Sequence, residues 1–151
     1  MIIDFDVHHG NGTEDIFGDD ERALMVSIFQ HPYYPYSGTE DIAPNMINVP
    51  LRVGSNGDAL RRAVEDKWLP ALDAFRPEMI FISAGFDAHA EDDMGGLRFV
   101  ESDYAWVTQR MREVAERHSA GDTGRAARFR EWFNRYGMAT GFIPAVGPIP
   151  L

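Results

Sequence analysis

The chain has 151 residues, of which 44% are hydrophobic and 25% are charged, a composition typical of one soluble globular domain. Its formal net charge of −10 argues against a direct nucleic-acid partner, because phosphate backbones are bound by basic surfaces. The absence of cysteine excludes disulfides and thiolate zinc sites, so any metal ligands must be His, Asp or Glu. No apolar run is long enough to span a membrane and no basic-then-apolar leader is recognisable, so we expect no membrane association and a cytoplasmic location.

The chain opens with an apolar strand that carries acidic and imidazole side chains two residues apart. Because side chains alternate between the two faces of a strand, Asp4, Asp6 and His8 are predicted to share one face. The apolar residues between them would occupy the other face, and the strand should end before Gly10. Polar groups on a buried strand are costly without a partner, which favours a cation site at its carboxyl end.

Further along the chain, buried strands are predicted to alternate with helices. The later predicted strands cover residues 23–28, 46–50 and 79–84. The predicted helices cover residues 14–17 and 58–75, the second kinked or divided at Pro70, and a third helix follows Ser102 as its N-cap. This alternation predicts an α/β fold with a mainly parallel sheet, in which ligands bind beyond the carboxyl ends of the strands.

The end of the chain differs in character from the rest. Residues 1–121 are predicted to form the metal-binding core, and residues 122–151 a divergent tail. In that tail we expect a basic amphipathic helix over residues 124–136, followed by an apolar end rich in Pro and Gly.

The polar residues at two strand ends predict a zinc centre. Catalytic zinc commonly takes three protein ligands and leaves a fourth position for water. Asp6 and His8 would supply two ligands, and the strand at 79–84 continues through Gly85 to Asp87, which we predict as the third. Zinc would polarise a substrate carbonyl and lower the pKa of its bound water. Metallophosphoesterases also place Asp-x-His after a strand, but their Gly-Asn-His-Asp-like turn and additional histidines are missing here.

Several other aromatic and imidazole residues have two possible interpretations. His9 is expected to point away from the ion, as a core or supporting residue, and His89 to cap a turn or lie on the surface. Tyr33, Tyr34 and Tyr36 either pack in a loop or form the wall of a channel beside the metal.

Motifs along the chain resemble, in order and in spacing, those of the histone deacetylase superfamily. They are DFDVHHGNGT at 4–13, VSI at 26–28, YP at 34–35, NVPL at 48–51, SAGFDAH at 83–89, MGGL at 94–97 and YAWVT at 104–108. The bacterial class II-like branch, with acetylpolyamine amidohydrolases and acetoin-utilisation proteins, is the most similar. The resemblance extends from residue 2 to about residue 121.

The resemblance implies a three-layer α/β/α fold of the arginase-deacetylase type. It also implies the same zinc ligands, a tunnel for the acyl-lysine lined by Tyr34, and two structural sites for K⁺ or Na⁺. The first would use the side chains of Asp4 and Ser27 with backbone oxygens of Asp6, His8 and Ile28; the second would use backbone oxygens around Phe17, Asp20 and Ala23. The implied reaction is the hydrolysis of acetylated amines, of the acetyl-lysine or acetylpolyamine class, by zinc-bound water.

The sequence also departs from the pattern of the superfamily. Members carry a His-His pair of general base and acid before the zinc strand, and a Gly-Gly-Tyr turn after it whose tyrosine steadies the oxyanion. Neither pattern is found, so we expect a chain truncated at its N-terminus, divergent after about residue 121, and feeble in amide hydrolysis.

Three functions are therefore open: a zinc-dependent deacetylase, an esterase for small acyl esters, and a catalytically impaired metal-binding fragment. Truncation would also expose a sheet edge and apolar surface. We therefore expect a homo-oligomer, with residues 124–151 helping to cover the gap.

Overall fold

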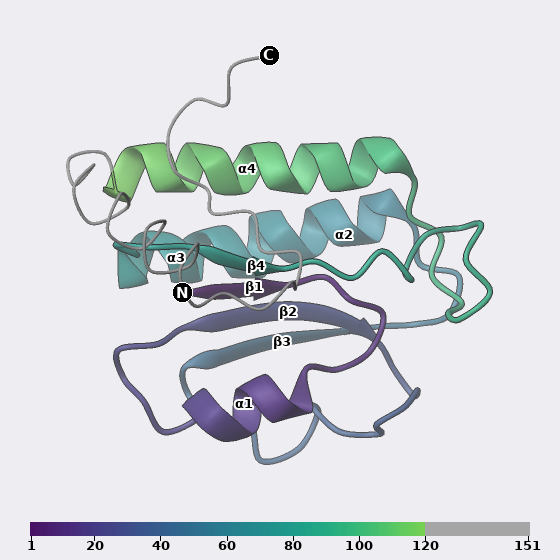
Figure 1. Cartoon of the computed structure of the whole chain (residues 1–151), viewed down its shortest axis with the longest axis horizontal. Helices are drawn as coiled ribbons and strands as arrows, with labels where there is room; N and C mark the ends of the chain where they lie inside the picture. Colours follow the sequence, from purple (N-terminus) through teal and green to yellow (C-terminus); the bar gives the residue numbers. More distant parts are fainter. Residues whose placement is uncertain (120–151) are drawn as a thin grey trace, which may run out of the picture.

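The computed structural model describes residues 1–119, and the predicted tail over residues 122–151 lies outside this part of the chain (Figure 1). The elements are β1 (Ile2–Asp4), α1 (Asn11–Phe17), β2 (Met25–Gln30), β3 (Met46–Leu51), α2 (Gly57–Ala63), a π-helical turn (Val64–Trp68), α3 (Leu69–Phe75), β4 (Phe81–Ser83) and α4 (Glu101–Ser119). None of these helices combines the length and the apolarity that crossing a membrane requires.

The strands form one parallel sheet in the order β3-β2-β1-β4. The strand β1 lies inside the sheet, and its Ile3 is in register with Val26 of β2 and with Ile82 of β4. Because the strands are parallel, β1 and β4 both end on the same side of the sheet, where the carboxyl ends of the strands lie (Figure 1). The polar turns that follow these two strands are therefore neighbours.

Helical layers lie on both faces of the sheet, and the predicted α/β fold is confirmed. One face packs against α2, α3 and α4 through a core whose side chains are fully buried. Among them are Ile3, Val26, Leu60, Val64, Trp68, Leu72, Val107, Met111 and Val114. The opposite face carries Ile2, Phe81 and Ser83, which line a pocket together with residues of α1.

The helix predicted over residues 58–75 is continuous but contains a wider turn. It begins with Asn56, whose side chain accepts a hydrogen bond from the backbone N–H of Asp58. The π-helical turn Val64–Trp68 lies directly before Pro70, the second residue of α3. Proline has no N–H to donate to a carbonyl of the preceding turn, and the π-helical turn accommodates this missing hydrogen bond. The kink or division predicted at Pro70 is thus a local change from an α-helix to a π-helical turn.

The prediction of Ser102 as an N-cap is wrong, because α4 already begins at Glu101. The start of the helix is held instead by Asp103, whose Oδ2 accepts from the backbone N–H of Val100 at 3.0 Å. In a capping box, the side chain of the third helical residue accepts a hydrogen bond from the backbone N–H of the residue just before the helix, and Asp103 makes this contact with Val100.

The strand boundaries also differ from those expected. The strand β1 ends at Asp4, so Asp6 and His8 lie in the turn that follows it. Pairing with β3 carries β2 on to Gln30, beyond the predicted end at residue 28. The strand β4 has only three residues, because it pairs only with the short β1.

Candidate metal centre

The turn after β1 carries two of the three predicted zinc ligands. The alternation of the strand persists beyond its end, since Phe5 and Val7 are buried in the core while Asp6 and His8 remain half-buried on the other side. The backbone N–H of Gln30 donates to the carbonyl of Val7 at 2.8 Å and fixes this turn to the end of β2. Core packing thus directs the polar side chains away from the helices.

The third predicted ligand comes from the turn after β4. The Oδ1 of Asp87 accepts from the backbone N–H of Val7 at 3.0 Å, so the two turns are bonded to each other. Gly85 lies where they come closest: a Cβ there would lie 2.1 Å from the Oδ2 of Asp6. Glycine is needed at this position because any side chain would push the Asp6 carboxylate aside.

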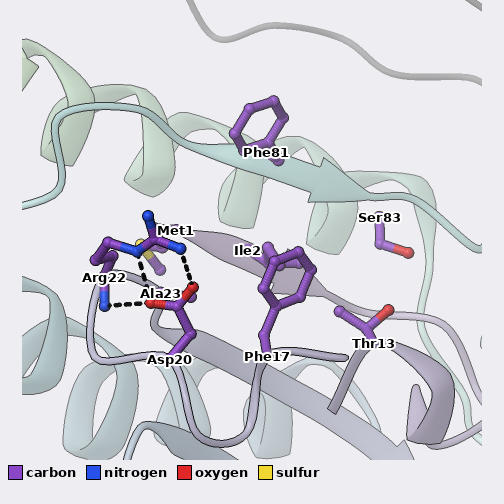
Figure 2. A pocket seen from close by; sticks show the side chains of 9 residues that line it. All are labelled: Met1, Ile2, Thr13, Phe17, Asp20, Arg22, Ala23, Phe81 and Ser83. Carbon is purple, nitrogen blue, oxygen red and sulfur yellow. Dashed lines mark hydrogen bonds and ion pairs between the residues drawn. The ribbon is translucent and has the colours of Figure 1, made fainter. Parts of the chain in front are cut away.

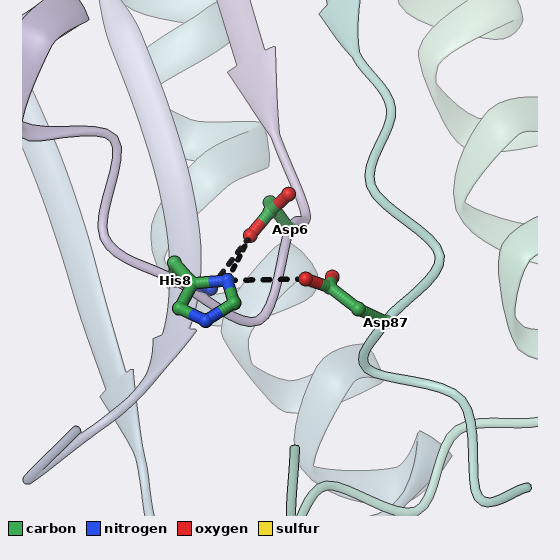
Figure 3. Close-up of side chains that lie close together, drawn as sticks. All are labelled: Asp6, His8 and Asp87. Atoms are coloured by element: carbon green, nitrogen blue, oxygen red, sulfur yellow. Dashed lines mark hydrogen bonds and ion pairs between the residues drawn. The ribbon is translucent and has the colours of Figure 1, made fainter. Parts of the chain in front are cut away.

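Asp6, His8 and Asp87 point toward one another (Figure 3). The Nδ1 of His8 lies 3.0 Å from the Oδ1 of Asp6 and 3.0 Å from the Oδ2 of Asp87. One ligand atom from each residue lies within 4.8 Å of the others, and no other such group of His, Cys, Asp or Glu occurs among residues 1–119. The three side chains are 22–34% exposed, so the centre is accessible from solvent.

This donor set fits zinc. Two carboxylates and one imidazole nitrogen are ligands that Zn²⁺ accepts, and their number leaves a position for water or substrate. Both carboxylates are oriented by the backbone, since the N–H of His8 donates to Asp6 at 2.7 Å and that of Val7 donates to Asp87. The fold therefore brings together the three residues predicted as zinc ligands, and their role in holding zinc stays a prediction.

Aromatic rings surround the centre. The ring of Tyr33 stacks on that of His8 with centroids 5.3 Å apart, and Tyr34 meets the same imidazole edge-on at 6.2 Å. Tyr34 is 67% exposed, and Phe86, next to Asp87, is 59% exposed. The predicted channel residue Tyr34 thus lies beside the centre. Phe86 was not predicted as a residue of the site, although its position next to the predicted ligand Asp87 could have indicated it.

His9 is turned away from the centre, as expected. Its Nδ1 lies 2.8 Å from the Oγ of Ser37 and its Nε2 lies 3.0 Å from the Oε2 of Glu14. Asn48 donates to the same Glu14 oxygen at 2.6 Å. This partly buried network joins α1 to the tyrosine loop. His89 accepts from the backbone N–H of Glu91 at 3.2 Å and so caps a turn.

Asp4 lies behind the centre as a buried carboxylate. Burial raises its pKa to about 6; the N–H of Asp6, at 3.0 Å from Oδ1, opposes that shift, and the Asp6 carboxylate adds to it. No ion pair among the described residues includes Asp4. Ser27, paired with Asp4 in the sheet, donates to Asn48 at 2.9 Å and keeps its own lone pairs. The Asp4 carboxylate is hydrogen-bonded by the Asp6 N–H and by Ser83 but has no ion-pair partner among the described residues. A buried carboxylate of this kind fits a monovalent cation, so the first predicted cation site, with Ile28, stays a prediction.

The residues of the second predicted cation site are placed differently. The carbonyl oxygens of Phe17, Asp20 and Ala23 converge, but they converge on the side-chain nitrogen of Asn45, at 2.8, 3.1 and 3.1 Å. Two of them, those of Phe17 and Asp20, each already accept two hydrogen bonds, so these two oxygens have no lone pair left for a cation. A single Asn before a strand has no periodic signal, so its role could not be found in the sequence.

A pocket of about 540 Å³ opens on the α1 face of the sheet (Figure 2). Its walls are largely apolar, with Arg22 bound to Asp20 at one side. Its lining residues are Met1, Ile2, Thr13, Phe17, Asp20, Arg22, Ala23, Phe81 and Ser83. None of them belongs to the predicted zinc centre, so this pocket is a separate feature of the molecule.

Comparisons with known proteins converge on one family. The family model of the histone deacetylase domain matches residues 1–123. The histone deacetylase-like amidohydrolase of Pseudomonas aeruginosa is 39% identical over 127 residues, which cover 80% of this chain and 33% of that protein. The chain spans between 8% and 38% of the length of the curated relatives compared with it.

Solved structures give the same result. The crystal structure of the HDA15 HD domain superposes with a TM-score of 0.72 at 33% identity, covering 75% of this chain and 35% of that one. The acetylpolyamine aminohydrolase from Burkholderia pseudomallei gives a TM-score of 0.67 at 27% identity, covering 74% and 35%.

Proposed function

Because the chain belongs to the histone deacetylase family, we propose that it holds zinc at Asp6, His8 and Asp87 and hydrolyses the acyl bond of acetylated amines. The observation that carries this proposal is the convergence of two carboxylates and one imidazole nitrogen at the carboxyl ends of β1 and β4. A bound zinc ion would polarise the acyl carbonyl and make water a stronger nucleophile.

The residues around the centre have roles in binding and orientation. Stacking against Tyr33 holds the plane of the His8 imidazole, and the backbone N–H groups hold the two carboxylates. Tyr34 and Phe86 offer apolar ring faces for the methylene chain of an acyl-lysine or acetylpolyamine. The net charge of −10 would attract a cationic polyamine, and the similarity to an acetylpolyamine aminohydrolase supports the same class of substrate.

The described residues offer less help for proton transfer. Both ring nitrogens of His9 are engaged by Ser37 and Glu14. Burial raises the pKa of Tyr104, and the nearby carboxylate of Asp87 raises it further, so its hydroxyl holds its proton and is no general base. An amine leaving group needs protonation, whereas an activated ester leaves without it. Residues 1–119 alone therefore favour ester hydrolysis, the second candidate function.

The test combines metal analysis with two substrates. The purified chain should contain about one zinc ion and hydrolyse a nitrophenyl acetate faster than an acetyl-lysine peptide, with loss of both activities on adding a chelator. Asp87→Ala should lose the zinc and the chelator-sensitive turnover. Asp93→Ala is the matched control, because Asp93 is an exposed acid in the same loop outside the ligand group.

The outcomes separate the three candidates. Turnover of both substrates supports a deacetylase, and turnover of the ester alone supports an esterase. Zinc without turnover leaves a metal-binding fragment, and a chain whose zinc content is unchanged by Asp87→Ala would contradict the proposed centre.

A further inference from the structure

The turn after α1 is closed by the side chain of Asn45. Its Nδ2 lies 2.8 Å from the carbonyl oxygen of Phe17, 3.1 Å from that of Asp20 and 3.1 Å from that of Ala23. These are the three oxygens that the family resemblance assigns to a second monovalent cation. The space among them is filled by an amide group of the chain itself.

Counting lone pairs shows that these oxygens have little left to offer an ion. A carbonyl oxygen accepts two hydrogen bonds. The oxygen of Phe17 already accepts from the N–H of Asp20 at 3.0 Å, and that of Asp20 accepts from the N–H of Ala23 at 2.9 Å. The amide of Asn45 supplies the second hydrogen bond in both cases.

The orientation of the amide follows from its three neighbours. All three are acceptors, so the NH₂ end must face them, with one of its two hydrogens shared between two oxygens. The reverse orientation would gather four oxygen atoms with no hydrogen among them, which only a cation could hold together. The Oδ1 of Asn45 is buried without a partner, which is the cost of placing the nitrogen in the cage.

Backbone and charge both favour the amide over an ion. The carbonyl of Asn45 accepts from the backbone N–H of Met25 at 3.0 Å, which fixes this residue at the start of β3 beside β2. The carboxylate of Asp20, whose backbone carbonyl is one of the three oxygens, is held by Arg22 at 2.7 and 2.9 Å. The carboxylate of Asp20 therefore already has a cationic partner within the chain.

We propose that the amide of Asn45 takes the place of the second monovalent cation in this chain and joins the turn after α1 to β3 without an ion. This role is independent of the proposed hydrolysis, and its test needs no turnover. In the wild type the turn stays closed whether or not K⁺ is present. An Asn45→Ala variant reopens the cage and becomes dependent on K⁺.

The first experiment is thermal unfolding in potassium chloride and in choline chloride at equal ionic strength. The Asn45→Ala variant should melt below the wild type in choline and regain part of the loss in potassium, beyond any response of the wild type. Asn56→Ala is the matched control, because it removes an Asn side chain that bonds the backbone at the start of α2, away from the cage. The melting temperature of this variant should be lower than that of the wild type by the same amount in both salts.

The second experiment locates the ion directly. Crystals of the wild-type protein soaked in thallous acetate should show no anomalous peak among the carbonyl oxygens of Phe17, Asp20 and Ala23. A peak there, with the amide of Asn45 rotated away, overturns the proposal even if the variant fails to fold. Equal responses to potassium in wild type and Asn45→Ala overturn it as well.

Discussion

Gly85 shows how one residue without a side chain allows two carboxylates to meet. A Cβ at this position would lie 2.1 Å from the Oδ2 of Asp6, closer than real contacts permit. The Gly85→Ala variant should therefore displace the Asp6 carboxylate and weaken zinc binding by about 10-fold or more, as loss of ligand orientation typically does. Titration against a competing chelator measures the change.

Gly12→Ala is the matched control for this substitution. Gly12 lies in the exposed part of α1, and a Cβ there meets nothing within 4 Å. Zinc affinity should stay the same, and stability should rise by up to about 1 kcal/mol, because Ala is the better helix former. Equal zinc affinities in all three proteins would show that Asp6 is not constrained by Gly85.

Between elements, a buried carboxylate joins α2 to α4. The Oδ1 of Asp103 accepts from the guanidinium of Arg61 at 2.8 Å, and its Oδ2 accepts from the N–H of Val100. Gly57 makes room for it, since a Cβ there would lie 2.0 Å from the Oδ1 of Asp103. The Asp103→Ala variant should lose about 2 kcal/mol of unfolding free energy, because the substitution removes both the charge-assisted hydrogen bond with Arg61 and the helix-capping hydrogen bond with Val100.

Urea unfolding measures this loss, with Glu116→Ala as the control. Glu116 pairs with Arg112 on the exposed side of α4, where ion pairs contribute little. Its removal should change stability by less than about 0.5 kcal/mol. Equal effects of the two substitutions would contradict a structural role for Asp103.

A second contact between helices is sensitive to pH. Asp73 of α3 lies 2.6 Å from Arg117 and 2.9 Å from His118, near the end of α4. The hydrogen bond with His118 lowers the pKa of Asp73 from its ordinary value of 3.8, and Arg117 adds to that effect. A depressed folded-state pKa stabilises the fold above 3.8, and this stabilisation is lost as the pH falls through the lower folded value.

The Asp73→Asn variant removes this contribution. The wild type should be more stable by up to about 0.5 kcal/mol at a pH of about 5.5, since the pair is half exposed and screened. The difference should shrink as the pH falls below 3.8. Urea midpoints at several pH values measure it, and a difference that grows on acidification would contradict the assigned sign.

On the scale of the whole molecule, the two edges of the sheet differ. The edge strand β3 contains Pro50, which has no N–H and discourages a further strand. The strand β4 stands at the other end of the order β3-β2-β1-β4. The pocket lined by Ile2, Phe17 and Phe81 opens beside it. We keep the prediction of a homo-oligomer that covers this region.

Sedimentation velocity over a range of concentrations tests self-association. Phe17→Glu should shift the population toward monomer, because it places a charge in the apolar pocket. Ile16→Glu should not, because Ile16 is 72% exposed and does not line the pocket. A wild-type chain that stays monomeric at high concentration would contradict the prediction.

Much of the architecture could be predicted because it depends on local patterns. Apolar patterns indicated each strand and helix in residues 1–119, although β1 ends at Asp4 and not just before Gly10. Alternation separated Asp6 and His8 from their core-facing neighbours. The errors fall at element ends, as at Ser102, where the deciding hydrogen bond comes from Asp103. Such ends depend on single side-chain contacts that carry no periodic signal.

By itself, the sequence determined the α/β class, the family and the candidate ligands, because hydrophobic period and motif order are properties of short segments. Only the tertiary structure decided which groups meet. Asp87 bonds the N–H of Val7 across 80 positions, and Asn45 reaches the carbonyl of Phe17 across 28. These two contacts depend on strand order and register. In a parallel sheet, the turns that follow the strands lie at one end and the turns that precede them lie at the other, so residues distant in the sequence become neighbours.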